Sequence, residues 1–126
     1  MPEYVQLNRD SKNIEVISTG DVSPEDLKKS LESVVELRKT TGYRLVLCDT
    51  QYQLSMPHLR DYKAFIESLP SDLVVAVLVN YNGATRDVQH MGEAMAQRTP
   101  TAYKLFYEKE KALEWLEFMR QFINRN

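Results

Sequence analysis

The sequence predicts an α/β domain with a mixed five-stranded sheet, and two apolar stretches carry most of that prediction. Both Arg44–Asp49 and Asp72–Asn80 are rich in Val and Leu, lack polar alternation and stop at a polar residue. A strand with one solvated face alternates, whereas a strand buried on both faces is apolar throughout, as in parallel sheets covered by helices. A helical pattern over Pro57–Leu69 separates the two stretches. We therefore expect a parallel β-α-β unit.

The first forty residues predict an antiparallel hairpin followed by a helix. Short strands are expected at Tyr4–Asn8 and Ile14–Ser18, on either side of a turn-like segment. The helix is expected to begin at Ser23, a good N-cap, with Pro24 at the first helical position. It is expected to end at Gly42, which suits the C-cap.

The rest of the chain predicts alternating helices and strands, for a total of about four helices. A loop is expected at Thr50–Ser55, leading into the helix of residues 57–69. The next helix, 85–97, has a thin apolar stripe interrupted by Gly92, which costs about 1 kcal/mol relative to Ala. A fifth strand is expected at Ala102–Tyr107, and a strongly apolar last helix at Lys109–Ile123.

Length and composition predict one ordinary globular domain spanning residues 1–126. The chain is 43% hydrophobic and 27% charged, and its net charge of -2 gives no field that would attract nucleic acid. Cys48 is the single cysteine, so no disulfide forms within the chain, which fits a reducing compartment. The N-terminus lacks the features of a signal peptide, and we expect a cytoplasmic protein.

Two segments resemble the SpoIIAA-like, or STAS-like, family. The first is Gly20–Asp26, a glycine followed by a capped helix start, and the second is Phe106–Leu116, similar to the family's closing Phe and Glu-x-Ala-Leu-x-Trp-Leu helix. A buried strand ending in an acid, at Asp49, also fits. The resemblance implies a mixed five-stranded sheet and a non-enzymatic role, because the family is related in shape to bacterial anti-sigma-factor antagonists and compared with lipid-transfer domains.

The antagonists switch by phosphorylation of a Ser in an Asp-Ser-x-Gly-like context, and this chain departs from that pattern. Asp49 is followed by Thr50, and the next serine is Ser55. A phosphoryl group on Ser55 would suit the positive end of a helix dipole. The alternative is that Ser55 caps the helix, since Pro57 follows within its first turn.

A ligand site is expected where the parallel strands end, because open α/β sheets bind ligands outside the carboxyl ends of their strands. The polar and aromatic residues at these ends are Asp49, Thr50, Tyr52, Asn80, Tyr81 and Asn82. The alternative is that Asp49 and Asn80 only cap and turn the chain while the tyrosines lie on the surface.

Two apolar surfaces also suggest binding. Met91 and Met95 form a soft stripe that suits an adaptable lid over a small amphipathic ligand or a lipid surface, or an ordinary helix docked on the sheet. Trp115 and the broad apolar face of the last helix suggest either a homodimer interface or residues that all belong to the hydrophobic core.

The sequence gives no basis for catalytic residues, a metal or a cofactor. Cys48 lies in an apolar run, so its pairing with His58 as a nucleophile is disfavoured. His58 and His90 lack partners at metal-ligand spacing, and the four glycines form no nucleotide fingerprint. We expect a non-enzymatic STAS-like domain that binds a small amphipathic or lipid-like ligand, with peripheral membrane contact; the alternative is a partner-switching module that binds another protein.

Overall fold

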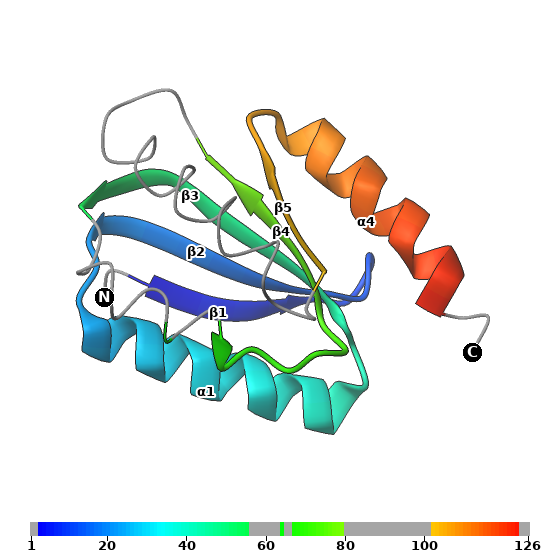
Figure 1. Ribbon diagram of the computed structural model, residues 1–126, viewed down its shortest axis with the longest axis horizontal. Helices are drawn as coiled ribbons and strands as arrows, with labels where there is room; N and C mark the ends of the chain where they lie inside the picture. Colours follow the sequence, from blue (N-terminus) through cyan, green and yellow to red (C-terminus); the bar gives the residue numbers. More distant parts are fainter. Residues whose placement is uncertain (1–2, 56–63, 65–66, 80–101, 124–126) are drawn as a thin grey trace.

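A computed structural model describes residues 3–55, 64, 67–79 and 102–123, and these contain a single five-stranded sheet (Figure 1). Its strands are β1 (Glu3–Asn8), β2 (Asn13–Asp21), β3 (Leu45–Ser55), β4 (Val74–Leu78) and β5 (Ala102–Phe106). They lie in the order β1-β2-β3-β4-β5. The β1–β2 pair is antiparallel, and every other neighbouring pair is parallel. The predicted mixed sheet, with its leading hairpin, is therefore confirmed.

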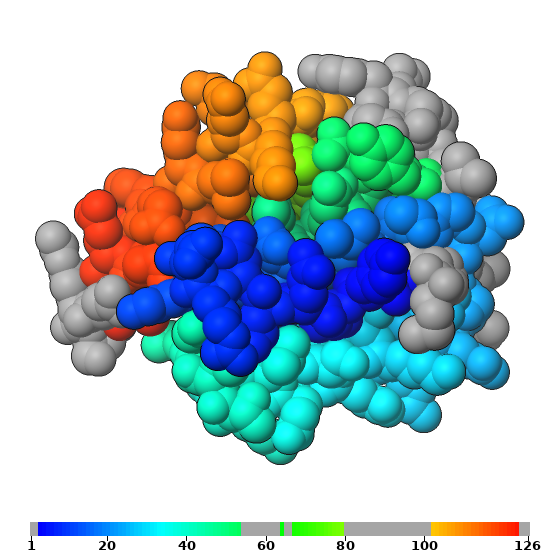
Figure 2. Space-filling model, turned by 180° about the vertical axis from the view of Figure 1, so that it is seen from behind, coloured from blue at the N-terminus to red at the C-terminus, as the bar shows by residue number. Residues whose placement is uncertain are grey.

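Two helices lie within the described residues, α1 (Pro24–Thr41) and α4 (Lys109–Ile123). They cover opposite faces of the sheet, α1 against β1 and β2 and α4 against β3, β4 and β5 (Figure 1). Seen from behind, the β1–β2 hairpin lies between them (Figure 2). The other two predicted helices fall on 57–69, most of which lies outside the described residues, and on 85–97, all of which does.

The start of α1 is fixed by a reciprocal pair of hydrogen bonds. The backbone N–H of Asp26 donates to Ser23 Oγ at 3.1 Å, and the backbone N–H of Ser23 donates to Asp26 Oδ2 at 2.9 Å. These bonds satisfy two donors that helix geometry leaves without partners. At the other end Gly42 adopts φ 77°, a left-handed conformation that glycine takes without strain, and its N–H donates to the Arg38 carbonyl. Both predicted helix ends are confirmed.

Ser23→Ala is expected to destabilise the protein by about 1 kcal/mol, the usual cost of removing a serine N-cap. Urea unfolding followed by circular dichroism would measure the loss. Ser33→Ala, an exposed position within the same helix, is the matched control and should change stability little. An equal effect at both positions would contradict the capping role.

Alternation along the strands divides the core into two layers. On β3, Val46 and Cys48 face the α1 side, whereas Leu45 and Leu47 face α4. All five residues of β4 are buried, as its unbroken apolar run predicts. The α4 layer is completed by Ala112 and Leu116, both fully buried.

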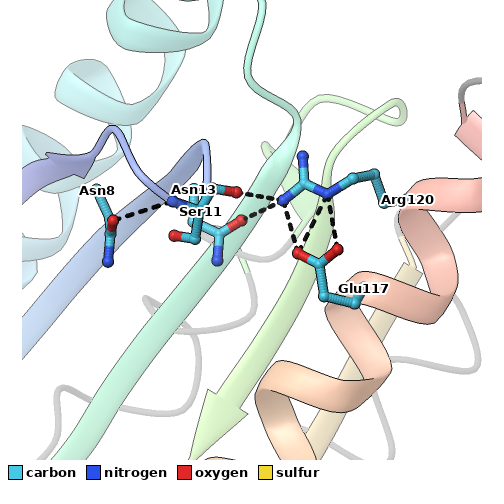
Figure 3. A network of polar contacts seen from close by, with 5 residues as sticks. All are labelled: Asn8, Ser11, Asn13, Glu117 and Arg120. Carbon is cyan, nitrogen blue, oxygen red and sulfur yellow. Dashed lines mark hydrogen bonds and ion pairs between the residues drawn. The ribbon is translucent and has the colours of Figure 1, made fainter.

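A polar network joins the end of α4 to the β1–β2 turn (Figure 3). Arg120 donates through Nη2 to the buried Asn13 Oδ1 at 3.0 Å and to the Ser11 carbonyl oxygen. Glu117 accepts from the same guanidinium at 3.1 Å. Because charge-assisted hydrogen bonds are strong and directional, Arg120 fixes how α4 is rotated about its axis.

The prediction of a loop at Thr50–Ser55 is wrong, because β3 continues through these residues. The reason is that β2 also continues past its predicted end at Ser18 and supplies a parallel partner. The register pairs Thr19 with Tyr52 and Asp21 with Ser55, with bulges on the way. Beyond Asp49, which pairs with Leu78 at the end of β4, the two strands form a ribbon of 19–21 and 50–55, here called the β2–β3 ribbon.

Candidate functional site

Asp49 lies at the base of the β2–β3 ribbon rather than at the tip of a strand. Its Oδ1 accepts hydrogen bonds from the backbone N–H and the side-chain Nε2 of Gln51, both at 3.1 Å. Between Asp49 and Tyr52 the register with β2 shifts by one residue, as in a β-bulge. The carboxylate therefore supports the bulge.

Thr50 is buried at the same bulge. Its Oγ1 donates to the Leu78 carbonyl oxygen at 2.8 Å, so it joins β3 to the last residue of β4. This bond satisfies a carbonyl at the end of the parallel ladder. Thr50 thus lies where β3 passes the end of β4 and continues as the β2–β3 ribbon.

Tyr52 is exposed, with 68% of its surface accessible. Ser55 is the last residue of β3 and pairs in register with Asp21, so its backbone is in a strand. The structure thus brings Asp49, Thr50, Tyr52 and Ser55 onto one strand. The remaining predicted site residues lie outside the described residues: Asn80, Tyr81, Asn82, Met91 and Met95.

A cavity of about 40 Å³ lies between α1 and the sheet, and sequence reasoning missed it. Aliphatic side chains form most of its wall, while its polar lining comes from Glu3, Ser18, Ser30, Thr50 and Gln53. This volume exceeds the 10–15 Å³ or so that one water needs, but it is well below the roughly 300 Å³ of a small-molecule pocket.

Glu3 joins three elements at the polar end of this cavity. Ser18 Oγ of β2 donates to its Oε2 at 2.5 Å, and Ser30 Oγ of α1 donates to its Oε1 at 2.6 Å. Burial raises the pKa of the Glu3 carboxyl, and the two hydroxyl bonds oppose that rise. A sequence signal existed, because Ser18 and Ser30 stand at apolar-face positions, two residues after Val16 and four before Val34.

Cys48 also lines the cavity, and burial raises the pKa of its thiol to about 12. A thiol with that pKa is protonated at neutral pH and is a weak nucleophile. The structure therefore places Cys48 as a small apolar residue of the sheet, as the sequence predicts.

We expect Cys48 to resist a disulfide-exchange reagent such as Ellman's reagent at pH 8 in the native protein. The same thiol should react fully and quickly in denaturant, where its pKa returns to about 8.5. The absorbance of the released thiolate measures both rates. Rapid reaction of the folded protein would show that the thiol is more accessible and more acidic than this geometry allows.

Within the described ranges, no three His, Cys, Asp or Glu side chains gather closely enough to hold a metal ion. His58 and His90 lie outside those ranges. None of the helices in the described segments combines the length and apolar character that crossing a bilayer requires.

Comparison with solved structures identifies the fold. The chain is similar to an uncharacterised protein of the DUF3478 family with a SpoIIAA-like fold from Shewanella loihica PV-4, with 17% identity, 90% of this chain and 91% of that chain covered, and a TM-score of 0.63. It is also similar to an anti-sigma factor antagonist from Mycobacterium paratuberculosis, with 16% identity, 91% and 92% coverage, and a TM-score of 0.62. No family model matches the sequence, and neither does any curated protein. The chain has a SpoIIAA-like fold, as the resemblance of its sequence predicts.

Proposed function

We propose that this protein is a non-enzymatic regulatory module that binds a protein partner through its β2–β3 ribbon. The observation that carries the proposal is the likeness, over nine-tenths of the chain, to a solved anti-sigma factor antagonist. At this identity the likeness shows the fold alone, so the argument for a binding surface comes from the residues of the ribbon.

The ribbon carries an exposed aromatic side chain on a well-supported backbone. Tyr52 exposes 68% of its surface, while Gln53 beside it is buried. Tyrosine is enriched in protein interfaces because it offers a large apolar area together with a hydroxyl. It also loses little conformational entropy on binding.

The bulge at the base of the ribbon supports a preorganised surface. Asp49 holds the Gln51 backbone and side chain, and Thr50 holds the Leu78 carbonyl. A surface segment that is already held in its bound conformation loses less conformational entropy when it binds a partner. The structural roles of Asp49 and Thr50 are thus compatible with a function for the residues that follow them.

The shifted titratable groups of the described segments support binding rather than catalysis. Asp26 caps α1, Glu3 joins β1 to β2 and α1, and Cys48 is an inert thiol. A catalytic acid or base needs a pKa near the working pH and access to a substrate. Each of these three groups has a packing or capping role instead.

Ser55 is the proposed point of regulation. It stands opposite Asp21 in the register of the ribbon. A phosphoryl group there would add up to about two negative charges to the end of the ribbon and so change the surface offered to the partner.

Binding of a small amphipathic ligand beneath Met91 and Met95 ranks second. Both residues lie outside the described segments. The cavity that the described side chains line, at about 40 Å³, is too small for a lipid chain, so it adds no support to that proposal.

A photo-crosslinking amino acid placed at Tyr52 tests the partner-binding proposal in the cells that make the protein. Tyr4, a second exposed tyrosine, lies on the edge strand β1 and is the matched control site. We expect a distinct protein adduct from position 52 that is absent from position 4, and a loss of that adduct in the Ser55→Asp variant but not in Ser55→Ala. Identical adducts from both sites, or none from position 52, would contradict the proposal. Equal adducts from both Ser55 variants would remove only its regulated form.

A further inference from the structure

The outer face of α4 carries two exposed phenylalanines that the core does not use. Phe118 and Phe122 are 54% and 48% exposed, and their rings meet edge to face with centroids 5.0 Å apart. Large aromatic side chains are mostly buried in soluble proteins, and exposed pairs of them are typical of interaction sites.

The position of these rings follows from the way α4 is seated. Ala112 and Leu116, fully buried, face the sheet, and Arg120 is held over the β1–β2 turn by Asn13 (Figure 3). Since successive helical residues are 100° apart, residues two beyond Leu116 and Arg120 point to the other side. Phe118 and Phe122 are one turn apart there and form one continuous apolar strip.

A shallow hollow of about 600 Å³ runs along this face. It is lined by Glu110, Leu113, Glu114, Glu117, Phe118 and Gln121. Its mostly apolar lining and its extent along α4 suit the packing of an amphipathic helix against this face.

Charge on the rim of the hollow decides which occupant fits. Glu110, Glu114 and Glu117 are all exposed, but Glu117 is paired with Arg120 at 3.1 Å, and Lys111 reaches Glu114 only at 3.9 Å. A surface pair as long as that of Lys111 and Glu114 contributes little, so Glu110 and Glu114 keep the rim acidic. A second copy of the chain facing the same hollow would set these carboxylates against their equivalents, which is unfavourable.

We propose that the outer face of α4 docks a basic amphipathic helix of another protein. Its apolar residues, at i, i+3, i+4 and i+7, pack on Leu113, Phe118 and Phe122. Its Lys or Arg residues lie beside the carboxylates of the rim. This surface is separate from the β2–β3 ribbon, because α4 packs on β3, β4 and β5 from the face opposite α1. The inference therefore stands independently of the function proposed above.

The test uses the full chain and two fluorescein-labelled synthetic helices of about 18 residues, or five turns. One contains Leu on one face and Lys on the other, and its counterpart has Glu in place of Lys. Fluorescence anisotropy measures binding at low salt, where screening is weakest. We expect the Leu–Lys helix to bind and the Leu–Glu helix to bind far more weakly.

Two pairs of variants locate the site. Phe118→Ala with Phe122→Ala is expected to weaken binding of the Leu–Lys helix by about tenfold or more, as for truncation of interface anchors. Tyr4→Ala, which removes an exposed aromatic elsewhere, should leave it unchanged. Glu110→Lys with Glu114→Lys should reverse the preference toward the Leu–Glu helix, whereas Glu32→Lys with Glu36→Lys on α1 should not.

The charge-reversal pair keeps the test decisive if the phenylalanine variant folds poorly, since both glutamates are exposed. Equal binding of the two helices, or unchanged binding after either α4 double substitution, would overturn the proposal. So would sedimentation showing a dimer that Phe118→Ala with Phe122→Ala dissociates, because the occupant would then be a second copy of this chain.

Discussion

Replacing Leu116 by alanine is expected to destabilise the protein by about 3 kcal/mol, within the 2–5 kcal/mol typical of large-to-small substitutions in a core. Leu116 is fully buried on the inner face of α4 and packs in the layer that contains Leu45, Leu47 and Ala76. The loss combines the transfer free energy of the deleted methyl groups with the cost of the cavity left between helix and sheet. Equilibrium unfolding in urea would measure it.

Phe118→Ala is the control for this prediction, because it removes an even larger side chain from the same helix. Phe118 is 54% exposed, so its loss should cost well under 1 kcal/mol. A similar loss at both positions would mean that α4 is not docked on the sheet through Leu116. The same measurement tests whether the proposed α4 surface can be altered without unfolding the chain.

The parts of the fold that the sequence predicted are those that depend on local chemistry. An unbroken apolar run over Val74–Leu78 predicts a strand buried on both faces, and all five residues are buried. Ser23, Pro24 and Gly42 set the ends of α1 through capping bonds that span only a few residues. Such signals are visible in the sequence because their partners are close in it.

The continuation of β3 to Ser55 was not visible, because it depends on a distant partner. Apart from Leu54, residues 50–55 are polar or aromatic and would suit a loop, but β2 offers Thr19, Gly20 and Asp21 as a parallel partner. The paired residues are 33 or 34 positions apart in the sequence. Pairing over that separation is set by topology rather than by local propensity.

The ligand site expected at the strand ends stays a prediction, because the strand end on which it was based also depends on this distant pairing. The rule that ligands bind at the carboxyl ends of strands selects Asp49, yet that carboxylate supports a bulge because β3 does not end there. Phe122 belongs to the apolar pattern of the last helix, but it is 48% exposed. Periodicity gives the direction of a side chain and not the extent of the sheet beneath it.

The buried cluster of Glu3, Ser18 and Ser30 should contribute strongly to the stability of the fold. Glu3→Ala is expected to cost about 2 kcal/mol, because it leaves two buried hydroxyls without their acceptor. Glu3→Gln retains an amide oxygen as acceptor, and a serine hydroxyl can rotate to accept from its N–H, so it should cost less. Urea unfolding of both variants at pH 7 tests the difference, and equal stabilities would contradict the role of the cluster.

The pH dependence of the Glu3→Gln comparison has a definite sign. Burial raises the pKa of Glu3 above its ordinary value of 4.5, so between that value and the higher native one the folded protein binds more protons than the unfolded chain. Stability then falls as pH rises through this window, and the penalty for the buried charge is complete above the native pKa. Wild type should therefore gain stability relative to Glu3→Gln as the pH is lowered from neutrality toward 4.5.

Unfolding curves for the two proteins across that pH range isolate the effect of Glu3, because the two proteins share all other titrating groups. A difference that stays constant, or that changes in the opposite direction, would show that the carboxyl is not held in the buried cluster between β1, β2 and α1.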